Sequence, residues 1–567
     1  MDLVFQQRFV TGQDRFDTDL RDLEILQVET GTYLCASTGR NGGLSLFQLT
    51  GGGARPVLQD QHWHQNAGLG TGDFALAEIG GEMQLLQQNS QGGALLSYQI
   101  GGGDSLSRQS LTSLPAGTDG GLGVLTTAAL SAGHSVVYGI TGTGELTGWR
   151  LDGSGRAQNE ISRTGGADHY QMPQVRALTT APATGSEAGL LFVADAAGQG
   201  LHSYRINSQT GALQAADSLT MADGLPVADP SALQSFQAHG ATWVLMAASG
   251  TGSLSLFQVT RAGGLSLADH LNDTLTTRFG GASVLQVVTV GDHVLVLAAG
   301  NDDGLSLLEM LPSGRLVHVQ SLSHEAGLGL ENVTALEAVV MGDQLEIYVT
   351  SGSTAGISQF TLDLATAGMV ATAAAGELRG SGGDDLLEGG GGAVTITGRA
   401  GDDILVAQGA GTVLTGGSGA DQFVFAAVTG RMVVSDFRPG EDQLDLSMIP
   451  GLYGPGQLQI TERGDGLELA FGETEIRVHS AAGTALTLQD IWPDGRFSTP
   501  DRVALAPPQE DGLQYGGSGA DHLEGGQRRI SSRVWTAMMY CLALVAPIVC
   551  WAKRGWTLWT GAPETTR

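Results

Sequence analysis

The chain has 567 residues, a net charge of −30 and 87 glycines, about twice the usual glycine share. Hydrophobic residues make up 41%, too many for a disordered acidic chain, and the glycines lack the every-third-residue period of collagen. The negative charge argues against nucleic-acid binding because phosphate would be repelled, and three cysteines exclude a disulfide scaffold. A large, Gly-rich, acidic, all-β protein remains.

Seven copies of one short motif fill the first two thirds of the chain. Each lies beside apolar runs and Gly-rich turns, so each unit of about 50 residues is predicted to hold four short strands. The copies are LSLFQL at 44–49, LLSYQI at 95–100, LTGWRL at 146–151, LHSYRI at 201–206, LSLFQV at 254–259, LSLLEM at 305–310 and ISQFTL at 357–362.

Four strands in each unit are typical of a propeller blade, whose middle strands are covered on both faces and are therefore apolar on both. Residues 1–372 resemble the seven-bladed β-propellers, which include lactonase-like members. Residues 3–10 are expected to add an outer strand to the last blade and close the ring. No family catalytic set is found to carry over from this resemblance.

Beyond residue 375 the period shortens to nine. The units are GSGGDDLLE at 380–388, GGGGAVTIT at 389–397, GRAGDDILV at 398–406, AQGAGTVLT at 407–415 and GGSGADQFV at 416–424. Glycine allows tight turns that leave carbonyls free to face a cation, and Asp at the sixth position adds the hard oxygen that Ca²⁺ prefers. The eighth position is always apolar, which predicts a core.

These units resemble the RTX (hemolysin-type) calcium-binding repeat, in which two nonapeptides make one turn of a parallel β-roll. The resemblance implies a roll over residues 376–427 and Ca²⁺ as its cofactor. The residues that it predicts as metal-binding are Gly380, Gly383, Asp385, Gly398, Gly401, Asp403, Gly416, Gly419 and Asp421.

The sixth position keeps Asp in the odd units only, since Val394 and Thr412 stand in the even ones. Alternate units stack on the same side of a β-roll, so the carboxylates are expected to form one column. We predict about two inter-turn Ca²⁺ sites, between Asp385 and Asp403 and between Asp403 and Asp421. The fifth-position residues Asp384 and Asp402 are expected to face solvent.

Residues 428–495 resemble the module that follows the roll in serralysin-type proteins and are expected to form a β-sandwich cap. The motif DF-x-x-G-x-D-x-U-D-L is matched by Asp436, Phe437, Gly440, Asp442, Asp445 and Leu446. Its interpreted role is structural packing. The protease itself is absent from the sequence, because His324-Glu325 lacks the second His of H-E-x-x-H.

The end of the chain changes character. A Pro-rich linker over 496–512 precedes one isolated repeat over 513–526, whose Asp521 is a further Ca²⁺ candidate without an expected stacking partner. The tail over 527–567 has six basic residues and one acid, and 534–552 carries no formal charge. A reading-frame change or truncation is favoured there over a membrane anchor, although this length would suffice for a membrane helix.

Other candidate groups are weaker. His62 and His64 would point to one side of an extended strand, as a metal pair requires, but packing is the preferred interpretation. Asp195 ends an apolar run, and Asp302-Asp303-Gly304 has the composition of a turn. The sequence contains no nucleophile elbow, phosphate-binding loop or C-x-x-C motif.

Two functions remain open. The first is a secreted, Ca²⁺-binding RTX protein whose propeller recognises a cell-surface glycan or protein. The second is an extracellular propeller enzyme, such as a lactonase or other hydrolase. No N-terminal signal peptide is evident, and RTX-like proteins generally leave the cell through a type I secretion apparatus that reads a C-terminal signal, so a secreted, extracellular location is expected.

Overall fold

The computed structural model is all-β apart from a few short turns of helix. It describes residues 2–39, 41–63, 74–89, 94–101, 105–113, 122–130, 134–141, 146–153, 157–162, 175–182 and 189–503, and short strands between 514 and 552. Residues 1–503 form one compact unit and residues 504–567 form another.

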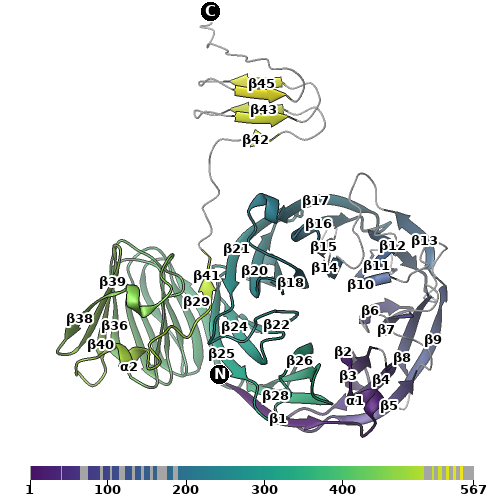
Figure 1. The fold of residues 1–567 in the computed structure, drawn as a ribbon, viewed down its shortest axis with the longest axis horizontal. Coiled ribbons are helices and arrows are strands. Elements are labelled where there is room, and N and C mark those ends of the chain that lie inside the picture. The colour runs from purple at the N-terminus through teal and green to yellow at the C-terminus, as the bar shows by residue number, and fades with distance from the viewer. Residues whose placement is uncertain are drawn as a thin grey trace, which may run out of the picture. The chain divides into compact units, whose positions relative to one another are not determined.

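Seven antiparallel sheets form a β-propeller (Figure 1). The first three blades are β2 Leu20–Val28, β3 Gly31–Thr38, β4 Gly43–Leu49 and β5 Val57–Trp63; β6 Phe74–Ile79, β7 Glu82–Asn89, β8 Ala94–Gly101 and β9 Ser105–Ser113; and β10 Leu122–Ala129, β11 Ser135–Thr141, β12 Leu146–Leu151 and β13 Ala157–Ser162. The next three are β14 Val175–Ala181, β15 Leu190–Asp195, β16 Gly200–Ile206 and β17 Leu213–Thr220; β18 Pro230–Ala238, β19 Ala241–Ala248, β20 Ser253–Val259 and β21 Leu265–Asn272; and β22 Val284–Val290, β23 His293–Ala299, β24 Gly304–Met310 and β25 Leu316–Ser323.

The seventh blade joins the two ends of the propeller sequence. It consists of β26 Val333–Met341, β27 Gln344–Ser351 and β28 Ile357–Asp363, with the N-terminal strand β1 Leu3–Phe9 at its edge. Strand β1 pairs antiparallel with β28, from Leu3 opposite Leu362 to Phe9 opposite Ile357. The predicted closure of the ring by the N-terminal segment is confirmed.

The recurring motif forms the third strand of every blade. Its prediction as an apolar, doubly covered strand is confirmed most clearly in blade 6, where every residue of β23 and β24 is buried. The first strands β2, β6, β10, β14, β18, β22 and β26 lie on the inside of the ring and contact one another from blade to blade (Figure 1).

A parallel β-roll follows the propeller and consists of two sheets. One sheet holds β29 Ala367–Ala373, β31 Asp384–Gly389, β33 Ile404–Ala407, β35 Gln422–Phe425 and β37 Gln443–Asp445. The other holds β30 Gly376–Arg379, β32 Val394–Ala400, β34 Val413–Ser418, β36 Gly430–Phe437, β40 Thr474–Ser480, β39 Gly466–Phe471 and β38 Gln459–Arg463. Leu387, Leu405 and Phe423 are register partners, which confirms two nonapeptides per turn.

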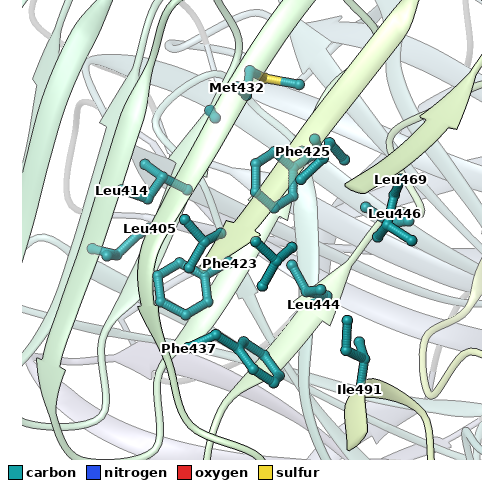
Figure 2. Packing of buried hydrophobic residues seen from close by; sticks show 14 of the residues in the cluster. Leu405, Leu414, Phe423, Phe425, Met432, Phe437, Leu444, Leu446, Leu469 and Ile491 are labelled. Atoms are coloured by element: carbon teal, nitrogen blue, oxygen red, sulfur yellow. The ribbon is translucent and has the colours of Figure 1, made fainter. Parts of the chain in front are cut away.

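The eighth-position side chains form the core between the two sheets. Leu387, Ile396, Leu405, Leu414 and Phe423 are all 0% exposed. Figure 2 shows Leu405, Leu414 and Phe423 beside residues of the following segment, such as Phe437 and Leu444.

A separate β-sandwich cap is not seen in the described residues. Strand β37 extends one sheet of the roll, while β36, β40, β39 and β38 extend the other. One apolar cluster therefore runs from Leu387 in the first repeat to Trp492 near the end of this segment. The segment continues the roll because β36 pairs in parallel with β34 on one side and with β40 on the other.

The remaining elements of the first unit are short. They are α1 Asp14–Asp17, η1 Met221–Asp223, η2 Pro455–Gln457, α2 Leu488–Ile491 and β41 Asp501–Arg502. Strand β41 pairs with β21, the outer strand of blade 5.

In the second unit the described residues are strands with the spacing of the roll. They are β42 Gln514–Tyr515, β43 His522–Gly525, β44 Ser531–Val534, β45 Tyr540–Ala543 and β46 Val549–Ala552. Strand β43 pairs in parallel with β45, and β44 pairs with β42 and β46. The prediction that the repeat at 513–526 has no stacking partner is therefore wrong, because tail strands pair with it. Within the described part of the chain, no helix has the length and apolar character needed to span a membrane.

Candidate metal centre

Three sixth-position aspartates form a vertical column along one side of the roll, as the sequence predicts. The backbone N–H of Asp385 donates to Oδ1 of Asp403 at 2.9 Å, and the N–H of Asp403 donates to Oδ1 of Asp421 at 3.1 Å. The three side chains are at most 1% exposed. Each carboxylate therefore uses one oxygen to bind a backbone N–H of the preceding turn and so helps to hold the stack together.

Asp442 is a fourth member of this column that the repeat pattern does not reveal. The N–H of Asp421 donates to Oδ1 of Asp442 at 3.1 Å across 21 residues, instead of the 18 that separate the earlier pairs. Strands β35 and β37 stay in register through Gln422 and Gln443. The sequence does carry a signal for this residue, because the dipeptide Asp-Gln occurs at 421–422 and again at 442–443. The two copies are 21 residues apart, three more than the repeat of one full turn, so a search at fixed spacing misses the second.

The second oxygen of each carboxylate has a hydrogen-bond partner at the two ends of the column but none in the middle. At one end, Oδ2 of Asp385 accepts the N–H of Ser381 at 2.6 Å, and at the other, Oδ2 of Asp442 accepts the N–H of Arg438 at 2.7 Å. In the middle, Oδ2 of Asp403 and of Asp421 are buried without any hydrogen-bond partner. A buried carboxylate oxygen with no partner is costly unless a cation satisfies it. In this column, Asp403 and Asp421 are therefore the residues at which a bound cation would satisfy a buried oxygen.

Glycine at the first position leaves room beside these oxygens. A Cβ built on Gly398 would overlap Oδ2 of Asp403 and would lie 2.7 Å from the carbonyl oxygen of Gly416. A Cβ on Gly416 would likewise overlap Oδ2 of Asp421. The space next to each unpartnered oxygen therefore exists only because no side chain occupies the first position.

Glycine at the fourth position serves the turn itself. Gly401 and Gly419 have φ of 114° and 129°, in the region that favours glycine. A Cβ on Gly401 would also lie 2.5 Å from the carbonyl oxygen of Gly383 one turn away. The predicted glycines thus meet two separate requirements, which are backbone conformation and close stacking.

The column is electrostatically strained without a cation. Burial, followed by the neighbouring carboxylates, raises the pKa of Asp403 to about 8 and that of Asp421 to about 7. Burial, with a smaller contribution from Asp436, also raises the pKa of Asp442 to about 6. Buried like charges disfavour ionisation of one another, and a divalent cation removes that conflict.

The opposite side of the roll carries a neutral version of the same contact. Thr412 replaces the aspartate, and its hydroxyl accepts the N–H of Val394 at 3.4 Å across 18 residues. Both residues are buried. The stacking contact is kept there, but the charged oxygens that would bind a cation are lost, as the sequence predicts.

One of the two fifth-position residues, Asp384, departs from its prediction, while Asp402 is half-buried. Asp384 was expected to face solvent but is only 6% exposed. It accepts the Thr366 hydroxyl at 2.7 Å and the N–H of Asp402 at 2.8 Å, while Asp402 accepts the N–H of Ala420 at 2.9 Å. The expectation failed because the propeller covers this face of the roll, which no repeat pattern reports.

The other candidates have structural partners. His62 lies on β5, 3.2 Å from Asp60 and 2.9 Å from the carbonyl oxygen of Leu106, while His64 lies outside the described residues. Asp195 accepts the N–H of Ala197 at 2.8 Å at the end of β15. Asp303 adopts the φ of 47° of a turn residue and accepts the N–H of Asn332. Asp521 also lies outside the described residues.

Comparison with known families bears on this column directly. A family model for the RTX calcium-binding nonapeptide repeat matches residues 379–409 and 515–527, in four copies. The chain carries RTX calcium-binding repeats. The matched residues include Asp385 and Asp403, and Asp421 lies beyond them. No curated protein matches this chain.

The RTX repeats account for the kind of site that the column can form. In the part of the chain that the structure describes, no three His, Cys, Asp or Glu side chains gather as a ready metal cluster. Stacked turns instead supply one carboxylate each and an array of Gly backbone carbonyls, a set of oxygen ligands suited to Ca²⁺. Ca²⁺ is the ion that these repeats bind.

Proposed function

We propose that this protein is a calcium-stabilised RTX protein that binds Ca²⁺ chiefly beside Asp403 and Asp421. The observation that carries the proposal is the pair of buried Oδ2 atoms without partners in the middle of the column. The predicted sites named Asp385 and Asp403 together, yet Oδ2 of Asp385 already accepts a backbone N–H. We therefore assign the ions to the two central residues, with the outer carboxylates closing the ends.

The residues of the roll prepare this side for a cation. The ladder of N–H groups fixes Oδ1 of each aspartate, which leaves Oδ2 to face the space beside Gly398 or Gly416. A bound divalent cation supplies the positive charge that the column lacks. At a concentration one hundred times the Kd, each site would add about 2.7 kcal/mol to the stability of the roll.

This stabilisation suits a protein that folds after export. In a compartment poor in Ca²⁺ the ionised column opposes folding, and an unfolded chain can pass a type I exporter. Outside the cell, Ca²⁺ would complete the fold without disulfides. We propose a secreted, extracellular protein on this basis, supported by the RTX repeats, with the propeller as a domain that recognises a cell-surface glycan or protein.

A hydrolytic propeller is a second candidate, favoured by one group of side chains inside the ring. Glu24 on β2 and Glu337 on β26 are neighbours on the inner strands, and burial followed by Asp22 raises the pKa of Glu337 to about 8. A carboxylic acid that stays protonated near neutral pH is suited to general acid catalysis. Hydrolysis of a lactone or glycoside that is lost in Glu337→Gln, with the propeller still folded, would support this candidate.

A calcium titration of the full-length protein tests the proposed function. Isothermal titration calorimetry should show binding of about two ions. Circular dichroism should show the gain of β-structure expected if residues 376–495 become ordered, and a chelator should reverse both changes. Asp403→Asn and Asp421→Asn should each weaken binding at least tenfold. The exposed Asp494→Asn, outside the column, is the matched control and should bind as the wild type does. Spectra that do not respond to millimolar Ca²⁺ or to chelator would refute the proposal.

The recognition role needs its own experiment. The Ca²⁺-loaded full-length protein is screened in parallel against immobilised glycans and against chromogenic esters, lactones and glycosides. Binding without turnover supports the recognition domain, and turnover supports the enzyme. Neither signal in a correctly loaded protein would leave the calcium function standing and reject both of these roles for the ligands tested.

A further inference from the structure

We propose that the calcium column is shared with the propeller, so that a cation bound there also holds the roll against blade 6. Glu309 of β24 is the propeller residue that we assign to this shared site. The inference rests on the proposed calcium function of the roll and adds to it a partner for the bound ions, namely the propeller of the same chain.

The first observation is a cavity where the column meets blade 6. It has a volume of about 100 Å³, and residues of both the propeller and the roll form its wall. Its acidic lining residues are Asp2, Glu309, Asp384, Asp385, Asp402, Asp403 and Asp421. No Lys, Arg or His is among the described residues that line it. Carboxylates packed at this density repel one another strongly unless a cation lies among them.

The second observation is independent of charge density. Asp403 and Asp421 both line this cavity, and both have an Oδ2 that is buried without a hydrogen-bond partner. The side chains are 0% and 1% exposed. Glu309 of the propeller lines the same cavity as these two residues of the roll, so a cation bound beside either of them would have a carboxylate of the propeller on the far wall.

Glu309 is held in place for this role. Its carboxylate is 1% exposed, and its Oε1 lies 2.5 Å from Nδ1 of His293 on the neighbouring strand β23. The other ring nitrogen of His293 lies 3.3 Å from the carbonyl oxygen of Gly368 at the start of the roll. The imidazole thus fixes Glu309 at the boundary and touches the roll as well.

The rest of the boundary does not depend on a cation. Leu311 and Val317 of the propeller pack with Leu386, Ile404, Val406 and Val424 on the outer face of the roll. The N–H of Ser313 donates to Glu388 at 3.0 Å, and the Gln422 amide donates to the carbonyl oxygen of His318 at 3.0 Å. These contacts set the position of the roll, while the acidic cavity beside them opposes it until a cation is bound.

Hydrogen exchange on the wild-type full-length protein is the first test. Addition of Ca²⁺ should slow exchange at residues 384–425 of the roll and also at residues 304–323 of blade 6. Residues 344–363 of blade 7 form the corresponding strands away from the cavity and should not respond. Protection of the roll without any change at 304–323 would overturn the shared site while leaving the proposed function intact.

A variant pair then tests Glu309 itself. Glu309→Gln keeps the shape of the side chain and removes its charge, so calorimetry should show one ion fewer or a Kd at least tenfold weaker for one ion. The matched control is Glu346→Gln, which replaces a glutamate that is 0% exposed in blade 7 and bonded to Tyr348. The control should bind Ca²⁺ as the wild type does.

The outcomes distinguish a failure of the shared site from a failure of the proposed calcium function. Unchanged stoichiometry and affinity in Glu309→Gln would remove the propeller from the site. Absence of Ca²⁺ binding in the wild type would remove both the site and the proposed function. If Glu309→Gln does not fold, the exchange experiment on the wild type still decides whether blade 6 responds to the cation.

Discussion

Carboxylates shielded from solvent in the roll and in the propeller differ in how their oxygens are satisfied. In the roll, Asp403 and Asp421 each use one oxygen to bind the turn before them and keep the other without a partner. In the propeller, Glu337 accepts the Gln286 amide at 3.1 Å and the N–H of Ala338 at 3.2 Å. Each aspartate therefore keeps an oxygen that a cation can satisfy, whereas the Glu337 carboxylate already accepts two hydrogen bonds.

The Glu337 carboxyl should make the propeller sensitive to alkaline pH. Burial and Asp22 raise its pKa to about 8 in the fold, against about 4.3 in the unfolded chain. The folded state therefore retains a proton that the unfolded state releases, and stability falls as pH rises between these two values. Glu337→Gln should unfold later in urea than the wild type at pH 9, by on the order of 1–2 kcal/mol, with little difference at pH 4. An identical difference at both pH values would contradict this.

The first-position glycines should be irreplaceable only on the acidic side of the roll. Gly398→Ala puts a methyl group where Oδ2 of Asp403 and the Gly416 carbonyl lie, so Ca²⁺ affinity should fall at least tenfold. Gly391→Ala, at the third position of a unit on the neutral side, is the control for an added methyl group in the roll, because nothing lies within 4 Å of its Cβ. Calorimetric titration should show a weaker Ca²⁺ affinity for Gly398→Ala than for Gly391→Ala. An equal loss of affinity in both variants would show that the methyl group does not act at the site itself.

At this scale the sequence predicted the column but not its limits. Strict nine-residue spacing identified Asp385, Asp403 and Asp421, because each unit repeats one local geometry. Asp442 escaped because its turn has three extra residues, and the burial of Asp384 escaped because it depends on a distant part of the chain. The repeat period shows which residues lie on the same face of the roll. It does not show which other part of the chain packs against that face.

Among the elements, β1 closes the ring, because it pairs with β28 at the edge of blade 7. Its residue Phe9 is 2% exposed and packs edge-on against Phe47 of blade 1 and Tyr348 of blade 7, with ring centroids 5.2 and 6.4 Å apart. The strand therefore joins the first and last blades by side-chain packing as well as by backbone pairing. Propellers gain stability by leaving no open edge. The contact of β1 with blades 1 and 7, the seam of the ring, should therefore contribute strongly to the unfolding free energy.

Truncation of Phe9 should test the seam. Phe9→Ala removes a buried aromatic ring and should cost about 3–5 kcal/mol of unfolding free energy in urea. Val4→Ala on the same strand is the control, since Val4 is 51% exposed, and it should change stability by less than about 0.5 kcal/mol. A Phe9→Ala variant as stable as the control would mean that backbone pairing alone closes the ring.

The elements of the propeller were predictable because the recurring motif always falls on the third strand, with apolar character on both faces. The end of the roll was not predictable to the same extent. Sequence resemblance suggested a sandwich, but β36 pairs in parallel with β34 and β40 and so continues the existing sheet. Whether a strand begins a new layer or extends an old one depends on which edge is free, and that is settled by the assembled roll.

On the scale of the whole molecule, residues 1–503 combine a propeller with a roll that carries RTX calcium-binding repeats. The propeller buries its aliphatic strands on both faces, whereas the roll carries unpaired charge along one side. The two parts should therefore differ in their response to calcium. The aspartates of the column account for a small part of the acidic composition.

Calorimetric unfolding should reveal this difference. In excess Ca²⁺ the roll and the propeller should melt close together, while in chelator a separate transition for the roll should appear at lower temperature. Asp403→Asn should show the chelator pattern even with Ca²⁺ present. A single transition at the same temperature with and without Ca²⁺ would contradict the division.

The one-sided column has a mechanical consequence. On the neutral side, backbone bonds such as Gly390 N–H to the Ala373 carbonyl at 2.8 Å and Val433 N–H to the Thr412 carbonyl at 2.9 Å need no ion. Loss of cations would leave uncompensated charge along the acidic side only, where backbone bonds such as Gln422 N–H to the Asp403 carbonyl at 2.7 Å also join the turns. Because the acidic side also borders blade 6, this repulsion would act at the boundary with the propeller and make that boundary sensitive to calcium concentration.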